Sequence, residues 1–436
     1  MQQIINPVNG PIKASITVPG SKTISLRAIL LAALAEGVSE ISGIYVNSAI
    51  RALVNALHQL GIVAQLDEEA KSCIIAGGGG KFPKRQATLW CDHSKAVARF
   101  LLTACAATPG VYYLDGPASL RKQSLSQLLH ILYRQGMQLI PSDARKLPFT
   151  MIGADSLEGG EINLDQAEQH HFISGLILLA PYARSPFTFT MPNLLDQPDI
   201  NLTCNLLSDF GVMIHRIHQG QFMVPTPQRY QARDYEIEPD LTLAAYYFAA
   251  AAITNGEISI KNGKRAQSRQ KQAIFLSWLE QMGCHVHETA NGITVQGTSE
   301  LRGIELQLSY FSSTLPALLA IAPFAKSASK ITFTCPLKEK ETNLLIAIKA
   351  ELTKLGLHID LGNNFIEVLP GNMKGCIVST HHNHRIAMAL SMIGLKVPEM
   401  IIADDKKITK IYPDFFNILQ KLNEKETIPI TLQDVK

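Results

Sequence analysis

Five glycines recur along this chain at almost constant intervals, and each follows a stretch with the pattern of an amphipathic helix. They are Gly61, Gly136, Gly211, Gly283 and Gly356, which by subtraction lie 75, 75, 72 and 73 residues apart. Glycine readily adopts the left-handed conformation that ends a helix, and a strand-like run follows each one. Solenoid repeats are usually about 20–50 residues long. This longer period therefore predicts a small α/β subdomain repeated six times, with the sixth unit ending near Asn423.

Six apolar runs mark the first helix of each expected unit. They span residues 28–37, 97–110, 171–183, 244–256, 315–327 and 385–396. Polar residues stand ahead of these runs or at their first positions, in segments 22–27, 93–99, 169–171, 240–242, 309–314 and 381–385. A helix N-terminus carries unpaired N–H groups and a partial positive charge, so several converging ends would bind a multiply charged anion. Repeated core helices without an active site are the alternative, and the period alone leaves it open.

The composition fits a globular protein with a large core. Of the 436 residues, 46% are hydrophobic, and the net charge of +3 is too small to indicate nucleic-acid or membrane binding. No apolar run reaches the roughly 18 residues that span a bilayer. Residues 1–13 lack the basic and apolar regions of a signal peptide. The seven cysteines include no CxxC pair, which indicates reduced, mostly buried thiols and a cytoplasmic protein.

Two proline-containing segments predict the domain boundaries. They are VPGSK at residues 18–22 and EIEPD at residues 236–240. Three expected units lie between them and three follow, so the predicted fold class is α/β with two domains of three units each. The first domain takes residues 1–20 plus 238–436, and the second takes residues 21–237. The first strand then joins the C-terminal half of the chain.

The segment PGSKTISLR, residues 19–27, is the strongest local motif. Lys22 stands at a helix start preceded by glycine, and Thr23, Ser25 and Arg27 share the first turn or so. Hydroxyls and backbone N–H groups at such a place can bind phosphate, while Lys22 supplies charge and a transferable proton. The alternative is that Thr23 or Ser25 is only an N-cap.

A second charged segment, PLKEKET at residues 336–342, also precedes an expected helix. It holds Lys338, Lys340 and Glu341. Glu341 beside the lysines can act as an acid or a base. A charge run of this kind is more often a solvated helix face, so both interpretations stay open at the level of sequence.

The segment STHHNHR, residues 379–385, holds three histidines and an arginine. The spacing of His381, His382 and His384 does not match HExxH, and no nearby cysteine or carboxylate completes a ligand set, so we expect no metal. Arg385 at the start of an apolar helix is better interpreted as a fork for a carboxylate or phosphate. Lys410, just before the last expected helix, is a further candidate for the same anion.

These motifs resemble those of the EPSP synthase family, the 3-phosphoshikimate 1-carboxyvinyltransferases of the shikimate pathway. The resemblance runs from PGSKTISLR through LKEKET and HNHRIAM to TKIYPDFF, so it covers the chain from end to end. It implies a two-domain enolpyruvyl transferase fold, with three βαβαββ units in each domain and with domains that close over the substrates. It also implies transfer of the enolpyruvyl group of phosphoenolpyruvate to the 5-hydroxyl of shikimate 3-phosphate, through a tetrahedral intermediate and with release of phosphate. A monomer that needs no metal or organic cofactor is implied as well.

The resemblance also assigns roles to single residues. Lys22 and Glu341 match the family's proton-transfer residues. The shikimate-phosphate side is matched by Thr23, Arg27 and Lys340, with Thr23 in place of the usual serine. The phosphoenolpyruvate side is matched by Arg385, with His384 next to it, and by Lys410. Ser25, in the first turn beside Thr23, is expected to contribute to substrate binding.

Several positions depart from the family's pattern. The family's Asn-Ala/Ser-Gly-Thr loop reads His93, Ser94, Lys95, Ala96 here, so a lysine replaces the glycine that makes room for phosphoenolpyruvate. Ser119 and Leu344 stand where the family has arginines. Ser313 stands at the aspartate that serves as base for the shikimate hydroxyl. The Ser-Ser-Gln motif reads Gln169, His170, His171, and Asn383 replaces an aspartate.

These departures leave three hypotheses. The first is a divergent EPSP synthase in which Lys95 and a histidine cover lost roles, so that Lys95, His171 and Ser313 still contact substrate. The second is a paralogue that acts on another anionic substrate, and the third is a non-catalytic anion-binding protein. Each charge-assisted hydrogen bond lost with an arginine removes about 1.5–3 kcal/mol, and the loss of a general base lowers a rate roughly 10²–10⁴-fold. The whole-chain resemblance favours a transferase of the EPSP synthase type.

Overall fold

The computed structural model describes residues 2–163, 170–191, 197–266, 268–289, 291–403, 408, 411–422 and 429–430. The chain forms two compact units, which we call unit 1 (residues 1–18 and 239–436) and unit 2 (residues 19–238). Both units combine small sheets with helices. This arrangement confirms the expected two-domain α/β class.

Unit 2 holds three four-stranded sheets among its described residues, with strand orders β14-β3-β5-β4, β6-β7-β9-β8 and β10-β11-β13-β12. The strands are β3 (Glu36–Ser42), β4 (Val63–Asp67), β5 (Ser72–Gly78), β6 (Gln86–Trp90), β7 (Gly110–Asp115), β8 (Gln138–Ile140), β9 (Phe149–Gly153), β10 (Gly160–Asn163), β11 (Phe187–Thr190), β12 (His215–His218), β13 (Gln221–Val224) and β14 (Tyr235–Glu236). In each sheet one pair of neighbouring strands is parallel and the other pairs are antiparallel.

Unit 1 also holds three sheets in its described part, with strand orders β1-β23-β22, β16-β17-β15-β2-β24 and β18-β19-β21-β20. The strands are β1 (Gln2–Ile5), β2 (Lys13–Ile16), β15 (Glu257–Lys261), β16 (His285–Thr289), β17 (Gly292–Gln296), β18 (Glu305–Leu308), β19 (Ser329–Phe333), β20 (Ile359–Leu361), β21 (Phe365–Val368), β22 (Ile377–Ser379), β23 (Met400–Ala403) and β24 (Pro429–Ile430). The first two strands of the chain pair with β23 and β15. The N-terminal segment therefore belongs to the same unit as the C-terminal half.

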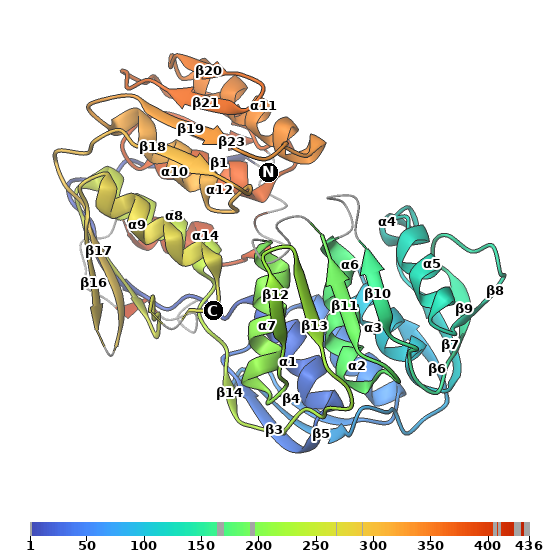
Figure 1. Cartoon of the computed structure of the whole chain (residues 1–436). Coiled ribbons are helices and arrows are strands. Elements are labelled where there is room, and N and C mark those ends of the chain that lie inside the picture. The colour runs from blue at the N-terminus through green and yellow to red at the C-terminus, as the bar shows by residue number, and fades with distance from the viewer. Residues whose placement is uncertain are drawn as a thin grey trace. The chain divides into compact units, whose positions relative to one another are not determined.

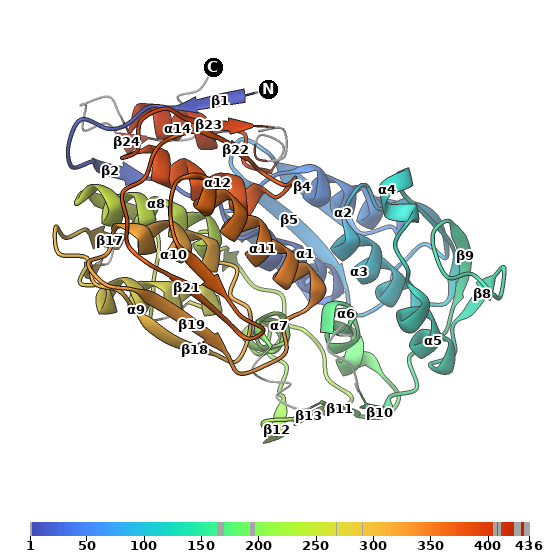
Figure 2. The ribbon, with the colours of Figure 1, turned by 90° about the horizontal axis from the view of Figure 1, so that it is seen from above.

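All six apolar runs form helices, as the sequence predicts. They are α1 (Lys22–Leu34), α3 (Lys95–Ala106) and α6 (His170–Leu179) in unit 2, and α8 (Leu241–Thr254), α10 (Leu315–Ile321) and α12 (His384–Gly394) in unit 1. Every residue of α10 is buried, and so is every residue of α1 from Ile24 onward. A helix that is apolar on all sides must lie inside its domain. Accordingly α8, α10 and α12 pack side by side within unit 1 (Figures 1 and 2), and α6 packs against α3 in unit 2.

The remaining described helices include five that end at the recurring glycines. These five are α2 (Ser48–Gln59), α5 (Ser126–Arg134), α7 (Pro198–Asp209), α9 (Ile274–Gln281) and α11 (Glu339–Lys354), and α4 (Ala118–Arg121) and α14 (Phe415–Lys421) complete the set. Each of the five glycines lies two residues after the helix end, with φ between 86° and 98°. The predicted left-handed helix stop is confirmed at all five. The count of six repeat units stays a prediction, and Asn423 lies outside the described residues.

Two sequence expectations about the chain as a whole can be compared with the structure. No helix in the described ranges is long and apolar enough to cross a membrane. All seven cysteines have free thiols, and five of the seven are buried. The expectation that most cysteines are core residues is therefore confirmed.

Candidate functional site

The N-terminus of α1 exposes Lys22, leaves Thr23 half-buried and buries the side chains from Ile24 onward. Gly20 lies so close to the neighbouring backbone that an added Cβ would stand 2.0 Å from the Gly43 carbonyl oxygen, so only glycine fits before this helix. Lys22 is the first helical residue, and the N-cap is Ser21, which makes no side-chain capping bond. The alternative that Thr23 or Ser25 is the N-cap is therefore wrong. Desolvation lowers the pKa of Lys22, and the nearby Asp92 carboxylate opposes this effect.

Ser25 and Arg27 are tied to other parts of unit 2. Ser25 is fully buried, and its hydroxyl donates to the Ser21 carbonyl at 2.9 Å. The Arg27 guanidinium donates from Nε to Thr203 Oγ1 at 2.8 Å, from Nη2 to Ser174 Oγ at 2.9 Å and from Nη1 to the Thr23 carbonyl at 3.1 Å. Two of these bonds link α1 with α7 and α6, and the third stays within α1. Burial lowers the pKa of Arg27, and the Asp199 carboxylate opposes this.

The N-terminus of α3 carries the lysine that replaces the family's glycine. Lys95 is the first helical residue and is exposed, and Ser94 is the N-cap, accepting from the Val97 N–H at 3.3 Å. Desolvation lowers the pKa of Lys95, and the nearby Arg99 charge adds to this. His93 Nδ1 lies 2.9 Å from Ser119 Oγ. Two positions that differ from the family's pattern therefore contact each other, next to the added charge of Lys95.

In unit 1 the start of α11 presents a lysine and a glutamate. Lys338 is the N-cap, and its backbone N–H donates to Glu341 Oε2 at 2.9 Å. Glu341 is half-buried, whereas Lys340 is exposed. A solvated helix face thus describes Lys340 but not Glu341, whose carboxylate is oriented by the helix N-terminus. Leu344, where the family has an arginine, is 7% exposed and packs into the core of unit 1.

The start of α12 holds an arginine with an unsatisfied donor. Asn383 is the N-cap and accepts from the Arg385 backbone N–H at 2.9 Å. Arg385 Nε is buried and makes no hydrogen bond to any described residue. A buried donor without an acceptor costs about 1–3 kcal/mol, so this guanidinium is suited to a ligand oxygen. The ring of His384 lies 6.4 Å from that of Tyr412.

Three helix starts of unit 1 come together around α8. Ser313 precedes α10. Its Oγ lies 3.1 Å from Thr242 Oγ1 on α8 and accepts a hydrogen bond from Gln272 Nε2 at 3.1 Å. Asp240, the N-cap of α8, accepts from the Thr242 N–H at 2.9 Å. Burial raises the pKa of Asp240, while its hydrogen bonds and the nearby charge of Arg385 act in the opposite direction. The starts of α8, α10 and α12 are therefore neighbours within unit 1.

Two of the expected site residues lie outside the described part of the structure, and two residues near the site were not predicted. The side chain of His171 and the whole of Lys410 lie outside the described residues. Sequence reasoning missed Asp92 as the carboxylate near Lys22, although it lies only three residues before α3. It also missed Gln272, for which no motif gives a signal. No group of three His, Cys, Asp or Glu side chains suited to a metal ion occurs in the described part of the chain.

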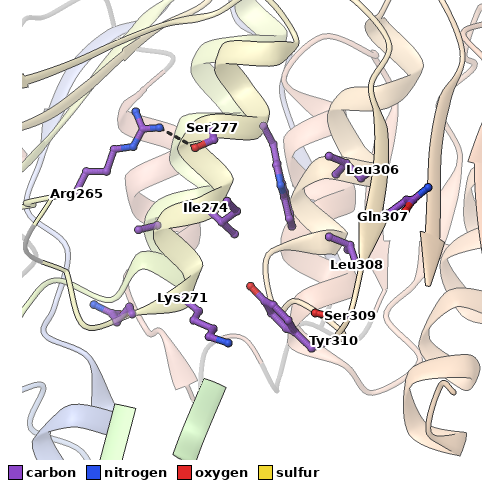
Figure 3. Close-up of a pocket in the computed structure, with 12 residues that line it drawn as sticks. Arg265, Lys271, Ile274, Ser277, Leu306, Gln307, Leu308, Ser309 and Tyr310 are labelled. Carbon is purple, nitrogen blue, oxygen red and sulfur yellow. Dashed lines mark hydrogen bonds between the residues drawn. The ribbon is translucent and has the colours of Figure 1, made fainter. Parts of the chain in front are cut away.

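A cavity of about 550 Å³ in unit 1 adjoins the starts of α8 and α10, since Gln270, Ser309 and Tyr310 line it and Gln270 accepts from the Leu241 N–H at 3.1 Å. Figure 3 shows it between α9 and the end of β18, and none of the expected site residues lines it. Arg265 on its wall is already paired with Glu280 at 2.8 Å and bonded to Ser277 at 2.7 Å. Lys271 stands over the Tyr310 ring at 5.1 Å. Glu280 thus neutralises Arg265, and none of the residues to which the sequence assigns substrate binding lines the cavity.

The geometry described so far defines a two-domain α/β protein with cationic helix starts, and comparisons with known proteins give its family. The family model of EPSP synthase (3-phosphoshikimate 1-carboxyvinyltransferase) matches residues 7–419. A 3-phosphoshikimate 1-carboxyvinyltransferase from Nostoc punctiforme is 34% identical over 414 residues, which cover 94% of this chain and 97% of that protein. One from Photobacterium profundum is 29% identical over 426 residues, covering 97% and 98%.

A solved structure also matches the fold. EPSP synthase from Acinetobacter baumannii superposes with a TM-score of 0.81 over 97% of this chain and 98% of that chain, at 21% sequence identity. This likeness concerns the fold alone. With the family model covering nearly the whole chain, the chain belongs to the EPSP synthase family, whose members are transferases.

Proposed function

We propose that this protein transfers the carboxyvinyl group of phosphoenolpyruvate to the 5-hydroxyl of shikimate 3-phosphate and releases inorganic phosphate. Two findings support the proposal. One is the match to the family from residue 7 to residue 419, and the other is the set of cationic or acidic residues that stand at helix starts. Lys22, Glu341 and Arg385 belong to that set.

The reaction moves three protons: the acceptor hydroxyl loses one, and C3 of phosphoenolpyruvate first gains one and then loses one. In the addition step, the acceptor hydroxyl oxygen bonds to C2 of phosphoenolpyruvate, its proton leaves and C3 gains a proton. In the elimination step, the bond from C2 to the phosphate oxygen breaks and C3 loses a proton, which restores the double bond. Lys22, whose pKa is lowered by desolvation, and Glu341 are the proposed proton carriers. A catalytic group works best when its pKa lies close to the working pH.

The observation that carries the proposal is the buried Nε of Arg385. It has no hydrogen-bond partner among the described residues and lies at the N-terminus of α12, where an anion is stabilised by the helix. A guanidinium can bind a carboxylate or a phosphate with two parallel hydrogen bonds. We assign to it the negatively charged end of phosphoenolpyruvate.

Ser313 and Leu344 favour a second candidate function. The Ser313 hydroxyl is bonded to another hydroxyl and to an amide, neither of which takes up a proton at neutral pH, and Leu344 is a core residue. A protein with these two changes could keep the anion site and use another anionic acceptor, or bind anions without turnover. The proposed transfer then requires that another group accept the proton from the hydroxyl.

The proposal is tested by supplying phosphoenolpyruvate with shikimate 3-phosphate and measuring phosphate release, together with the melting temperature with each ligand. The proposed function predicts phosphate release that depends on both substrates. Stabilisation by phosphoenolpyruvate without release would favour another acceptor or a non-catalytic role. If no phosphate is released and neither ligand raises the melting temperature, the proposed reaction is ruled out.

A further inference from the structure

A buried carboxylate lies beneath the turn that leads into α12. Glu351, on α11, has 0% exposure. Its carboxylate accepts from Lys354 Nζ at 2.8 Å, from the Ser379 backbone N–H at 2.9 Å and from His381 Nε2 at 2.6 Å. Burial raises the pKa of Glu351, but these bonds outweigh it and leave the pKa below its ordinary value. Because an ionised carboxylate only accepts hydrogen bonds, His381 must carry its proton on Nε2.

The turn itself has an uncommon backbone. His381 and His382 both adopt the left-handed conformation, with φ of 47° and 52°. Residues other than glycine, asparagine and aspartate rarely do so, and such conformations persist where surrounding contacts hold them. The bond from His381 to Glu351 is one such contact. The Asn383 N–H, which donates to the Thr380 carbonyl at 2.8 Å, closes the turn.

The same turn sets the direction of α12. Asn383 ends the turn, is the N-cap of α12 and accepts from the Arg385 N–H. Only three residues separate His381 from Arg385. A contact that fixes His381 on the buried Glu351 therefore also fixes the place from which the Arg385 side chain leaves the backbone.

We infer that His381 is a positioning residue: held by Glu351, it fixes the turn that orients Arg385 toward the anionic group of the substrate. His381 does not touch the substrate in this account and acts only through Arg385. The inference rests on the proposed function for the identity of the anion, but the link from Glu351 through His381 to α12 is a property of unit 1 alone.

Two substitutions at one position separate the side-chain link from the backbone conformation. In His381→Gln the side-chain amide can place a donor near the position of Nε2, whereas His381→Asn is too short to reach Glu351. Asparagine adopts the left-handed conformation more readily than glutamine. If the bond between His381 and Glu351 positions Arg385, the KM for phosphoenolpyruvate of His381→Gln stays close to that of the wild type, and the KM of His381→Asn does not. If only the backbone conformation matters, the order is reversed.

The primary measurement is the steady-state kinetics of transfer, with KM and kcat determined separately. His381→Asn is expected to raise the KM for phosphoenolpyruvate roughly 3- to 30-fold, within the range of substitutions that act through neighbours, with little change in kcat. His382→Asn, which substitutes the adjacent left-handed residue without removing the bond to Glu351, is the matched control and is expected to leave KM unchanged. A KM for His381→Asn equal to that of the wild type, or lower than that of His381→Gln, overturns the inference.

Hydrogen exchange at the Asn383 and Arg385 amides provides a readout that needs no turnover. Faster exchange in His381→Asn than in His381→Gln supports the link, and equal exchange in the two variants contradicts it. A wild type that catalyses no transfer defeats the proposed function and leaves this second test in force. Melting temperatures within about 3 °C of the wild type identify variants whose unit 1 is intact.

Discussion

The starts of α1 and α12 each carry an arginine, and the two arginines are held in different ways. Arg27 is 5% exposed and gives three hydrogen bonds to groups on α1, α6 and α7. Arg385 has a buried Nε with no bond to any described residue. A donor already satisfied by the protein contributes mainly to stability, whereas an unsatisfied one is available for a ligand. The contrast separates a buried cation that holds unit 2 together from one suited to binding an anion.

The largest effect is expected at Lys22, the exposed neighbour of Arg27 on α1. Lys22→Ala should lower kcat for carboxyvinyl transfer about 10²–10⁴-fold, as expected for the loss of a proton carrier, with little loss of stability. Phosphate release under saturating substrates measures this. Lys81→Ala is the control, since Lys81 is an exposed lysine of unit 2 paired with Asp155. An unchanged kcat in Lys22→Ala would remove Lys22 from the mechanism.

Arg27→Met tests the structural half of the comparison. Replacing the guanidinium removes three hydrogen bonds at a buried position, and charged hydrogen bonds are worth about 1.5–3 kcal/mol each. Part of this is offset because a buried charge no longer has to be desolvated, so we expect the free energy of unfolding to fall by about 2–4 kcal/mol. Urea unfolding of the whole chain measures it. Unchanged stability with a raised KM for shikimate 3-phosphate would instead make Arg27 a substrate-binding residue.

Arg385→Met tests the other half and should give the opposite pattern. Losing one charge-assisted hydrogen bond to the substrate costs about 1.5–3 kcal/mol, which corresponds to a KM for phosphoenolpyruvate roughly 10- to 150-fold higher. Stability should hold, because the substitution removes a buried donor that has no partner among the described residues. Arg385→Lys keeps the charge without the planar fork, so its KM for phosphoenolpyruvate should lie between those of the wild type and Arg385→Met. A large loss of stability in Arg385→Met would remove the contrast with Arg27.

The smallest effect concerns pH, at the turn that precedes α12. The pKa of Glu351 is lower in the folded protein than its ordinary value, since the bonds from Lys354, Ser379 and His381 outweigh burial. The folded state then binds fewer protons than the unfolded state over this interval, so stability rises with pH there. The contribution of ionised Glu351 to the free energy of unfolding is present above the ordinary glutamate pKa and is lost as pH falls through the lowered pKa of the folded state. Urea unfolding of wild type and Glu351→Gln across acidic pH should show a weaker pH dependence in the variant.

The helices and helix ends that follow from periodicity could be predicted from the sequence. Apolar runs such as that of α10 are typical of buried segments, and glycines such as Gly356, with φ of 95°, end helices because the left-handed conformation disfavours side chains. Family motifs then located Lys22, Glu341 and Arg385 at helix starts. These predictions depend on neighbours within one or two helical turns, which a sequence displays directly.

Contacts between distant positions could not be predicted in this way. Arg27 meets Ser174, which lies 147 positions further along the chain, and Glu351 meets His381, 30 positions away. In the sequence Glu351 is one glutamate in an amphipathic helix with several exposed charges, and nothing distinguishes it as buried. The three histidines of residues 381–384 were not expected to bind a metal, but nothing in the sequence indicated that His381 is bonded to a carboxylate on another helix.

The most direct test of the account is a single-turnover experiment with labelled phosphoenolpyruvate and shikimate 3-phosphate on the wild type and Arg385→Met. The account predicts that the wild type transfers the labelled carboxyvinyl group to the acceptor with an equal amount of phosphate released. Arg385→Met should do so only at much higher phosphoenolpyruvate concentration. Recovery of all the labelled phosphoenolpyruvate unchanged from the wild type, or equal dependence on its concentration in both proteins, would contradict it.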